Sequence, residues 1–261
     1  MHFTSETSAD GVIERTFALY DVTGVVWSPA SATDPAPLVL MGHGGGLHKF
    51  ATALVARARY YVTTCGYAVA SIDAPGHGER PRSAEDQAQV SRMLDARASG
   101  QSIDAIVTAY NASLAERAVP EWQATLDALQ TVPEIGSGGP VAYTGMTLAS
   151  AIGLPLAAVE QRITAAVFGG VLVYDALLEA ARRITIPIQF LLPWDDAEIS
   201  RRSGFELFDA FASPEKTLHA NPGGHHQVPW FETEDSAHFL TRHLGRGRPS
   251  DEPTPEGPVV R

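Results

Sequence analysis

Short apolar runs recur along the chain, and segments with helical periodicity separate them. The runs predict β-strands at residues 12–19, 23–27, 38–41, 67–72, 141–143, 165–168, 186–192 and 216–218. The periodic segments predict helices at residues 50–64, 84–98, 103–118, 147–158, 174–183, 201–212 and 232–243. The first two strands fit an N-terminal hairpin, and the later strands alternate with helices. This alternation predicts an α/β fold with a mostly parallel, doubly wound sheet and helices on both faces.

A chain of 261 residues is long enough for one α/β domain with a sizeable core. We expect a single domain over residues 1–244, with a helical insert at about residues 80–120 after the fourth predicted strand. Such an insert commonly forms a lid or pocket wall, but extra helices packed on the sheet fit the pattern equally well. Residues 245–261 are rich in proline, glycine and acidic residues, which predicts a disordered tail.

The composition narrows the classes of partner. A formal net charge of −11 leaves no basic surplus to neutralise phosphates, which argues against a nucleic acid or an anionic membrane as partner. Residues 1–10 are polar and acidic, so no signal peptide is apparent, and no run approaches the roughly 20 apolar residues that span a bilayer. Cys65 is the single cysteine and cannot form an internal disulfide. We therefore expect a cytoplasmic location and a small-molecule substrate.

The most informative segment is Val-Ala-Tyr-Thr-Gly-Met-Thr-Leu-Ala-Ser at residues 141–150. A β-like run turns through Gly145 and enters a helix-like run, which is the context of the G-x-S-x-G nucleophile elbow. Here the motif reads Gly-Met-Thr-Leu-Ala, so Thr147 occupies the nucleophile position and alanine replaces the last glycine. The motif predicts an exposed alcohol at the end of a strand.

Three further segments lie at predicted strand ends. The first is His-Gly-Gly-Gly at residues 43–46, a turn that lets backbone N–H groups face a developing oxyanion; the donors would be Gly45 and Leu148. The second, at residues 190–199, carries carboxylates, and the third is Pro-Gly-Gly-His-His at residues 222–226. The resulting order of alcohol, acid and histidine is that of α/β-hydrolase triads.

In the segments at residues 40–46, 71–81, 143–147 and 221–225 the chain resembles the α/β-hydrolase superfamily, and within it the bacterial dienelactone-hydrolase-like group. The resemblance runs from about residue 12 to residue 243 and includes Ser-Ile-Asp-Ala-Pro-Gly-His-Gly-Glu-Arg-Pro at residues 71–81. It implies a hydrolase of carboxylic esters, lactones or thioesters that works through a Ser–Asp/Glu–His triad and needs no cofactor. This chain departs from the pattern at the nucleophile itself, where Thr147 stands in place of serine.

The resemblance also assigns the other two members of the triad. The family places its base directly after the Gly-Gly pair, which selects His225 over His226. It places the acid three residues before an apolar residue, and Ile199 fits that slot, which selects Asp196 over Asp195. The acid would fix the histidine tautomer and stabilise the imidazolium.

Three roles remain open for Thr147: a nucleophile, a helix cap, or a hydrogen-bonding alcohol in a non-hydrolytic site. Ser150 is another candidate for the nucleophile, but it lies almost one helical turn further on and should be buried behind the elbow. The function is therefore expected to be hydrolysis by Thr147, His225 and Asp196. The alternatives are a lyase or cyclase on the same scaffold, in which the histidine moves protons, and a non-catalytic binding protein with a decayed site.

Other side chains near these segments are candidates for binding substrate. We expect a pocket wall from Leu47, His48, Met146, Trp194 and Trp230, although aromatic residues near strand ends are as often ordinary core. The histidines lack the H-x-x-x-H spacing of metal ligands, so no metal is expected. Substrate identity and oligomeric state remain open.

Overall fold

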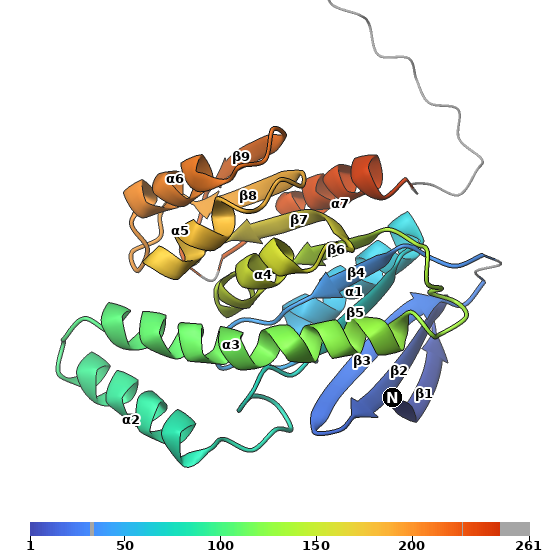
Figure 1. Cartoon of the computed structure of the whole chain (residues 1–261), viewed down its shortest axis with the longest axis horizontal. Coiled ribbons are helices and arrows are strands. Elements are labelled where there is room, and N and C mark those ends of the chain that lie inside the picture. Colours follow the sequence, from blue (N-terminus) through green and yellow to red (C-terminus); the bar gives the residue numbers. More distant parts are fainter. Residues whose placement is uncertain (32–33, 226, 246–261) are drawn as a thin grey trace, which may run out of the picture.

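The computed structural model describes residues 1–31, 34–225 and 227–245, so the tail predicted at residues 245–261 lies outside the described residues apart from its first glycine. Nine strands form one sheet in the order β1-β2-β3-β5-β4-β6-β7-β8-β9 (Figure 1). They are β1 (His2–Ala9), β2 (Val12–Leu19), β3 (Val22–Pro29), β4 (Leu38–Met41), β5 (Ala68–Ile72), β6 (Val141–Thr144), β7 (Ile163–Gly169), β8 (Ile188–Pro193) and β9 (Lys216–Asn221). The β1, β2 and β3 strands pair antiparallel up to β5, and the strands from β5 to β9 pair in parallel.

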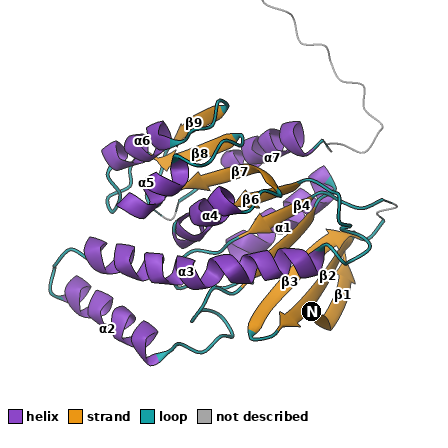
Figure 2. Ribbon diagram, viewed as in Figure 1, coloured by secondary structure: helices purple, strands orange, loops and turns teal. Residues whose placement is uncertain are grey.

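Helices cover both faces of this sheet (Figure 2). They are α1 (Thr52–Cys65), α2 (Ala84–Ala98), α3 (Asp104–Leu129), α4 (Leu148–Val159), α5 (Asp175–Ala181), α6 (Arg201–Ala210) and α7 (Trp230–Leu244). Buried side chains of α1 and α7 pack on one face, and those of α3, α4, α5 and α6 pack on the other, so the sheet is sandwiched between two apolar cores. The predicted α/β-hydrolase fold is confirmed. Among the described helices, none is both long and apolar enough to cross a bilayer.

One strand was not predicted. Every side chain of β1 is exposed, so this segment lacks the half-buried alternation that marks a strand in the sequence. Its backbone nevertheless pairs with β2 from Ala9 to His2, which turns the predicted hairpin into a three-stranded meander. The helical insert therefore follows the fifth strand of the chain rather than the fourth.

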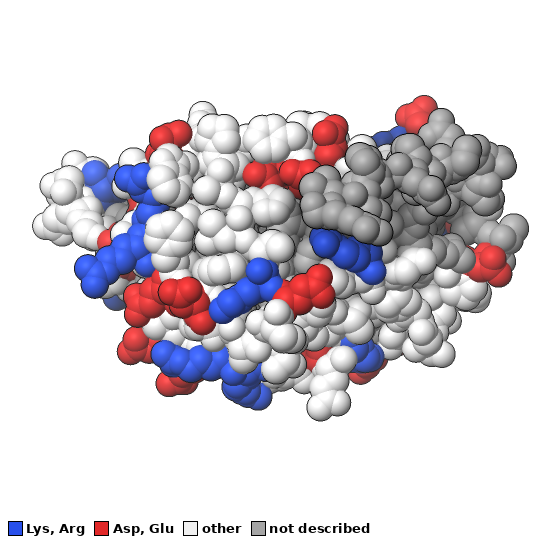
Figure 3. All heavy atoms as spheres, turned by 90° about the horizontal axis from the view of Figure 1, so that it is seen from above, with Lys and Arg blue, Asp and Glu red and all other residues white. Residues whose placement is uncertain are grey.

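Acidic and basic side chains are interspersed on the face of the molecule seen in Figure 3.

The end predicted for the second insert helix at residue 118 is wrong. The α3 helix continues through Pro120 to Leu129. Proline removes one backbone hydrogen bond and crowds the preceding turn, but Trp122, Leu126 and Leu129 carry the buried face of the helix onward and are at most 2% exposed. Burial of these large side chains offsets the cost of the proline.

The α2 helix is held to α3 by charge-assisted hydrogen bonds. Ser83 and Asp86 form a capping box at the start of α2, and Arg117 of α3 donates to both carboxylate oxygens of Asp86. Burial alone would raise the pKa of Asp86, but the hydrogen bonds from Arg117 and Ser83 outweigh it and lower this pKa to about 2. The insert is therefore a helical hairpin fixed at one end.

A buried ion pair links the loops that follow β4 and β5. Lys49 Nζ lies 2.6 Å from Asp73 Oδ2, and both side chains are buried. The same carboxylate accepts hydrogen bonds from the Lys49 amide and from the Thr23 hydroxyl. Gly78 is needed beside it, because a Cβ at residue 78 would overlap the Asp73 carboxylate. Arg80 adds a further contact by donating to the Asp73 carbonyl at 3.0 Å, so this aspartate braces the loop through its side chain and its backbone.

We predict that Lys49→Met destabilises the protein by roughly 3–5 kcal/mol, because it leaves the buried Asp73 carboxylate without its cation. Urea unfolding at neutral pH measures this loss. The matched control is Arg59→Met, which removes a largely exposed ion pair with Asp10 and should cost less than about 1 kcal/mol. Equal losses in the two variants would contradict this account.

We also predict that the stability lost in Lys49→Met depends on pH. Burial alone would raise the pKa of Asp73, but the hydrogen bonds and charge of Lys49 outweigh it and hold this pKa below the usual value. A depressed carboxyl pKa contributes stability above the unfolded value of about 3.9, and this contribution is lost as pH falls through the folded pKa. In Lys49→Met the cation is gone and burial raises the pKa of Asp73 instead. The stability difference between wild type and the variant should therefore shrink as pH falls through that raised pKa, above the ordinary value of about 3.9, and should level off below the folded pKa of wild type.

Candidate active site

The turn between β6 and α4 is the elbow predicted from the sequence. Thr147 has φ 56° and ψ −120°, and its amide donates to the carbonyl of Gly169 at 3.1 Å. Two glycines permit the close approach of strand and helix. A Cβ on Gly145 would lie 2.5 Å from the Cβ of Ala149, and one on Gly42 would lie 2.6 Å from the same atom. The turn therefore presents Thr147 at the carboxyl edge of the sheet.

The backbone of Thr147 is strained. Among the described residues it is the only β-branched residue with a positive φ, and such a conformation costs on the order of 1–3 kcal/mol. Helix capping does not explain it, because the Thr147 side chain makes no capping hydrogen bond to α4. The capping role considered for this residue is therefore absent, and strain of this kind is characteristic of functional sites.

Ser150 lies behind the elbow as expected. It is fully buried, and its single hydroxyl proton is shared between the carbonyls of Gly145 and Gly169, which lie 2.7 and 2.9 Å from Oγ. Its Oγ also accepts from the Gly169 amide at 2.9 Å. These bonds tie the start of α4 to the ends of β6 and β7. The hydroxyl is thus committed to the backbone that forms the elbow.

The predicted acid and histidine lie in contact. His225 Nδ1 is 2.9 Å from Asp196 Oδ2, and the Asp196 side chain is only 2% exposed. The other oxygen of Asp196 accepts from the amides of Glu198 and Ile199 at 2.8 and 3.0 Å, which fixes the carboxylate plane. Asp195 points elsewhere: its carboxylate accepts from the Gly223 amide at 3.2 Å and braces the loop before His225.

The glycine turn after β4 faces the elbow. A Cβ on Gly44 would lie 3.0 Å from Thr147 Oγ1, and one on Gly45 would lie 3.9 Å from the Cβ of Leu148. Within the described chain, no hydrogen bond is made by the amides of Gly45 and Leu148. These two residues line the same cavity as Thr147, so two amide donors without a partner in the described chain belong to the space that contains the hydroxyl.

His43 holds this turn in place. Its Nδ1 lies 2.9 Å from the Gly44 carbonyl, and its Nε2 accepts from the Ala74 amide at 3.0 Å. Since Nε2 accepts, Nδ1 carries the proton and donates. Burial lowers the pKa of His43 to about 4, so the ring stays neutral at neutral pH. His43 is a structural residue that connects the glycine turn to the loop after β5.

A cavity of about 360 Å³ opens beside the elbow. Gly45, Thr147, Leu148 and His225 all line it, so the predicted nucleophile, base and amide donors share one space. The helical insert forms its apolar wall. The insert side chains that line it include Val90, Met93 and Leu94 of α2 and Val107, Tyr110 and Leu114 of α3.

The five side chains expected to bind substrate do not line this cavity in the described structure. Met146 lies against Gly169, and Leu47 borders a neighbouring pocket that shares Gly46, His77 and Arg82 with this cavity. His48 accepts from the Phe50 amide. The Trp194 ring lies under the Arg201 guanidinium, and Trp230 packs edge-on against Tyr60.

The insert residues that do line the cavity could have been found in the sequence. Val107, Tyr110 and Leu114 recur at helical spacing and so share one face of α3. The sequence does not reveal that this face meets a site, because the packing direction of an insert is a tertiary property.

The α/β-hydrolase class is defined by the strand order of the sheet, the elbow at Thr147, the loop that carries Asp196 and the loop that carries His225. The chain belongs to the α/β-hydrolase superfamily and is an enzyme of its esterase type. It is 30% identical to a cold-adapted esterase from an Arctic intertidal metagenomic library, with a TM-score of 0.73 over 94% of this chain and 100% of that one. Neither the protein-family models nor the curated proteins compared with the sequence give a match.

More distant structures share the fold alone. Acetyl xylan esterase 1 from Thermoanaerobacterium sp. is 13% identical, with a TM-score of 0.68 over 92% of this chain and 87% of that one. Est1E from Butyrivibrio proteoclasticus, solved with ferulic acid bound, is also 13% identical, with a TM-score of 0.65 over 93% and 100%. The narrower resemblance to the dienelactone-hydrolase-like group stays a prediction.

The hydrogen bonds of Ser150 should contribute to the stability of the protein. Ser150→Ala should destabilise the protein by about 1–3 kcal/mol, since buried backbone groups of the elbow lose their partner. Urea unfolding measures the loss, and Ser203→Ala, which removes an exposed hydrogen bond to the Ser200 carbonyl at the start of α6, is a matched control that should change little. An unchanged stability in Ser150→Ala would show that these hydrogen bonds do not hold the elbow.

Proposed function

We propose that this enzyme hydrolyses carboxylic esters through a Thr147–His225–Asp196 triad. The observation that carries the proposal is the strained, uncapped Thr147 in one cavity with a histidine whose Nδ1 is 2.9 Å from a buried carboxylate. A strained residue is retained where the geometry serves a purpose. An exposed alcohol beside an oriented base is the arrangement that activates a nucleophile.

The first half of the reaction forms an acyl-enzyme. Thr147 Oγ1 attacks the ester carbonyl carbon while His225 Nε2 takes the hydroxyl proton. The carbonyl oxygen becomes negatively charged in the tetrahedral intermediate and accepts hydrogen bonds from the free amides of Gly45 and Leu148. When the carbonyl re-forms, the alcohol leaves with the proton that His225 returns.

The second half repeats these steps with water. His225 Nε2 removes a proton from water, and the resulting hydroxide attacks the acyl carbon in the same oxyanion site. The intermediate collapses by breaking the bond to Thr147 Oγ1, which takes its proton back from His225. The products are one carboxylic acid and one alcohol, and the enzyme returns to its starting state.

Asp196 orients the base. Its Oδ2 accepts the Nδ1 proton, which places the basic lone pair of the neutral ring on Nε2, and its negative charge stabilises the imidazolium that forms. The two amides on Oδ1 hold the carboxylate in this orientation. Asp195 supports the same loop from outside the triad.

The extra methyl of threonine needs room. A Cβ on Gly170 would lie 3.8 Å from Thr147 Cγ2, an ordinary van der Waals contact, so the methyl is not crowded from that side. A Cβ on Gly44 would lie only 3.0 Å from Thr147 Oγ1, so Gly44 leaves space on the hydroxyl side. The methyl still restricts χ1 and crowds the tetrahedral intermediate.

The cavity indicates the substrate class. Its wall from α2 and α3 is mainly apolar and its volume, about 360 Å³, is at the small end of ligand sites. We expect esters with a compact apolar acyl or alcohol group. Lactones and thioesters undergo the same acyl transfer and are further candidates.

The acid assignment is tested by a pair of neighbouring substitutions. Asp196→Asn should lower kcat by on the order of 10⁴, because the asparagine stabilises the wrong histidine tautomer. Asp195→Asn changes the same functional group one residue away and should lose far less. Rates on p-nitrophenyl acetate measure both. Equal losses, or a larger loss at Asp195, would show that the register is wrong by one residue.

The nucleophile is tested at Thr147 itself. Thr147→Ala should remove nearly all turnover of p-nitrophenyl acetate. Thr147→Ser should retain or raise it, because relief of methyl crowding is worth about 1–3 kcal/mol, or roughly 5- to 150-fold in rate. If the enzyme were a lyase or cyclase, Thr147→Ala would keep a substantial part of the native activity.

A further inference from the structure

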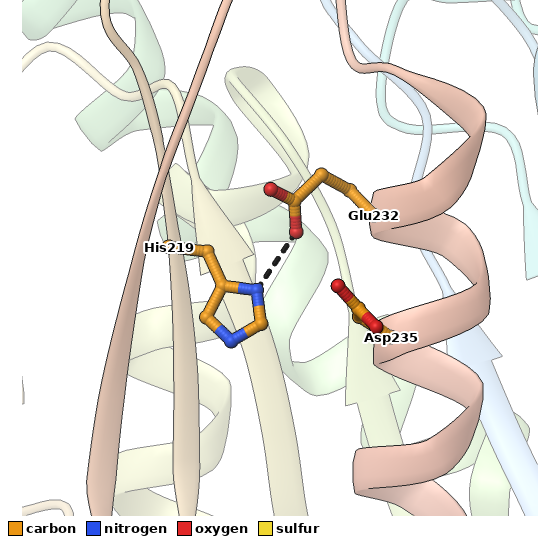
Figure 4. A group of neighbouring side chains, drawn as sticks. All are labelled: His219, Glu232 and Asp235. Atoms are coloured by element: carbon orange, nitrogen blue, oxygen red, sulfur yellow. Dashed lines mark hydrogen bonds and ion pairs between the residues drawn. The ribbon is translucent and has the colours of Figure 1, made fainter.

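The loop that carries His225 begins at the end of β9 and ends at the start of α7. A group of side chains joins these two elements: His219 projects from β9, and Glu232 and Asp235 project from α7. Figure 4 shows all three pointing toward one another. Their nearest nitrogen and carboxylate oxygen atoms lie within 4.8 Å of one another.

The chemistry of the group is that of a cation site. His219 Nδ1 lies 2.8 Å from Glu232 Oε2, and the Glu232 side chain is only 4% exposed. Glu232 and Asp235 are three residues apart on α7, so their carboxylates lie on one face of the helix. Within the described residues, no lysine or arginine forms an ion pair with either carboxylate. Two acidic groups thus meet one imidazole, without a basic side chain paired to them.

Gln189 supplies an independent observation. This β8 side chain is fully buried, its Nε2 lies 3.2 Å from the same His219 Nδ1, and its Oε1 has no hydrogen-bond partner. One ring nitrogen cannot donate to Glu232 and also accept from Gln189. The oxygen and nitrogen of an amide are nearly equal in size, so the Gln189 amide can equally be placed in the orientation turned by 180°. In that orientation the unpaired Oε1 takes the place of Nε2 beside His219 Nδ1. The buried amide oxygen then lies beside the His219 nitrogen that also contacts Glu232.

We propose that His219, Glu232 and Asp235, with Gln189 Oε1, bind a divalent metal ion. Ligands about 2.0–2.2 Å from one tetrahedral ion lie roughly 3–3.5 Å from each other. The distances of 2.8 and 3.2 Å from His219 Nδ1 to Glu232 and to the Gln189 amide are close to that spacing. An imidazole nitrogen with oxygen ligands suits Zn²⁺. Asp235 is exposed and closes the site from the solvent side.

The ion acts on the catalytic loop without taking part in the reaction. None of its ligands lines the cavity that contains Thr147. Binding instead links β9 to α7 across the segment that carries His225. A cross-link that closes a loop limits the conformations of that loop, so the bound ion stabilises the position of the base. The site is thus a positioning site for His225.

The test uses metal-free protein prepared with EDTA and Zn²⁺ as the probe. Isothermal titration calorimetry should show one Zn²⁺ per chain, and saturating Zn²⁺ should raise the Tm. His219→Gln and Asp235→Asn should each weaken this binding at least about tenfold, since second-sphere changes alone cost roughly 10- to 100-fold. Glu234→Gln changes a carboxylate one residue away on exposed surface of α7 and should bind Zn²⁺ like wild type.

In the absence of metal, Glu234→Gln should match wild type in Tm and in p-nitrophenyl acetate turnover, because its carboxylate lies on exposed surface outside the site. Far-UV circular dichroism checks that His219→Gln and Asp235→Asn are folded, and metal-free His219→Gln should melt below wild type because buried Glu232 loses its hydrogen-bond partner. Zn²⁺ binding that is equal in wild type and both variants would overturn the proposal and would assign the ion to another site, such as His225. No binding to wild type, or a Tm that does not rise with Zn²⁺, would overturn it as well.

Discussion

The turn between β6 and α4 is the constraint on which the rest of the site depends. Strand and helix meet so closely there that Gly42 and Gly145 have no space for a Cβ against Ala149. The chain can make this turn only with a positive φ at Thr147, which for a threonine is costly. Ser150 offsets part of that cost by binding the ends of β6 and β7. Packing thus forces the hydroxyl to the carboxyl edge of the sheet.

Two buried polar contacts bring the neighbouring loops to this point. The Lys49–Asp73 pair joins the loops after β4 and β5, and neutral His43 connects the glycine turn to Ala74. Both contacts are satisfied hydrogen-bond networks in low-dielectric surroundings, which makes them rigid. Among the described residues the amides of Gly45 and Leu148 make no hydrogen bond. A rigid set of free donors is what electrostatic stabilisation of an oxyanion requires.

Much of this arrangement was accessible from the sequence because it depends on local signals. Alternation of strands and helices predicted the sheet, and the order of Thr147, Asp196 and His225 on strand ends predicted that they would converge. The structure brings Thr147 and His225 into one cavity and Asp196 into contact with the histidine. Their catalytic roles remain predictions.

The parts that could not be predicted depend on tertiary packing. The β1 strand has no buried side chain, and the backbone pairing that forms it leaves no apolar pattern. The continuation of α3 through Pro120 depends on a buried face that outweighs a local breaker. His219, Glu232 and Asp235 belong to two elements, so no spacing of metal ligands within one segment could have indicated that they meet.

The central claim is that a threonine at the elbow forms a covalent acyl-enzyme. Reaction with a fluorophosphonate probe, followed by mass spectrometry of the labelled peptide, tests it most directly, because the probe reacts only with an activated nucleophile. The account predicts one adduct per chain on Thr147, absent in His225→Ala. An adduct on Ser150, or no adduct in an enzyme that still hydrolyses p-nitrophenyl acetate, would contradict it.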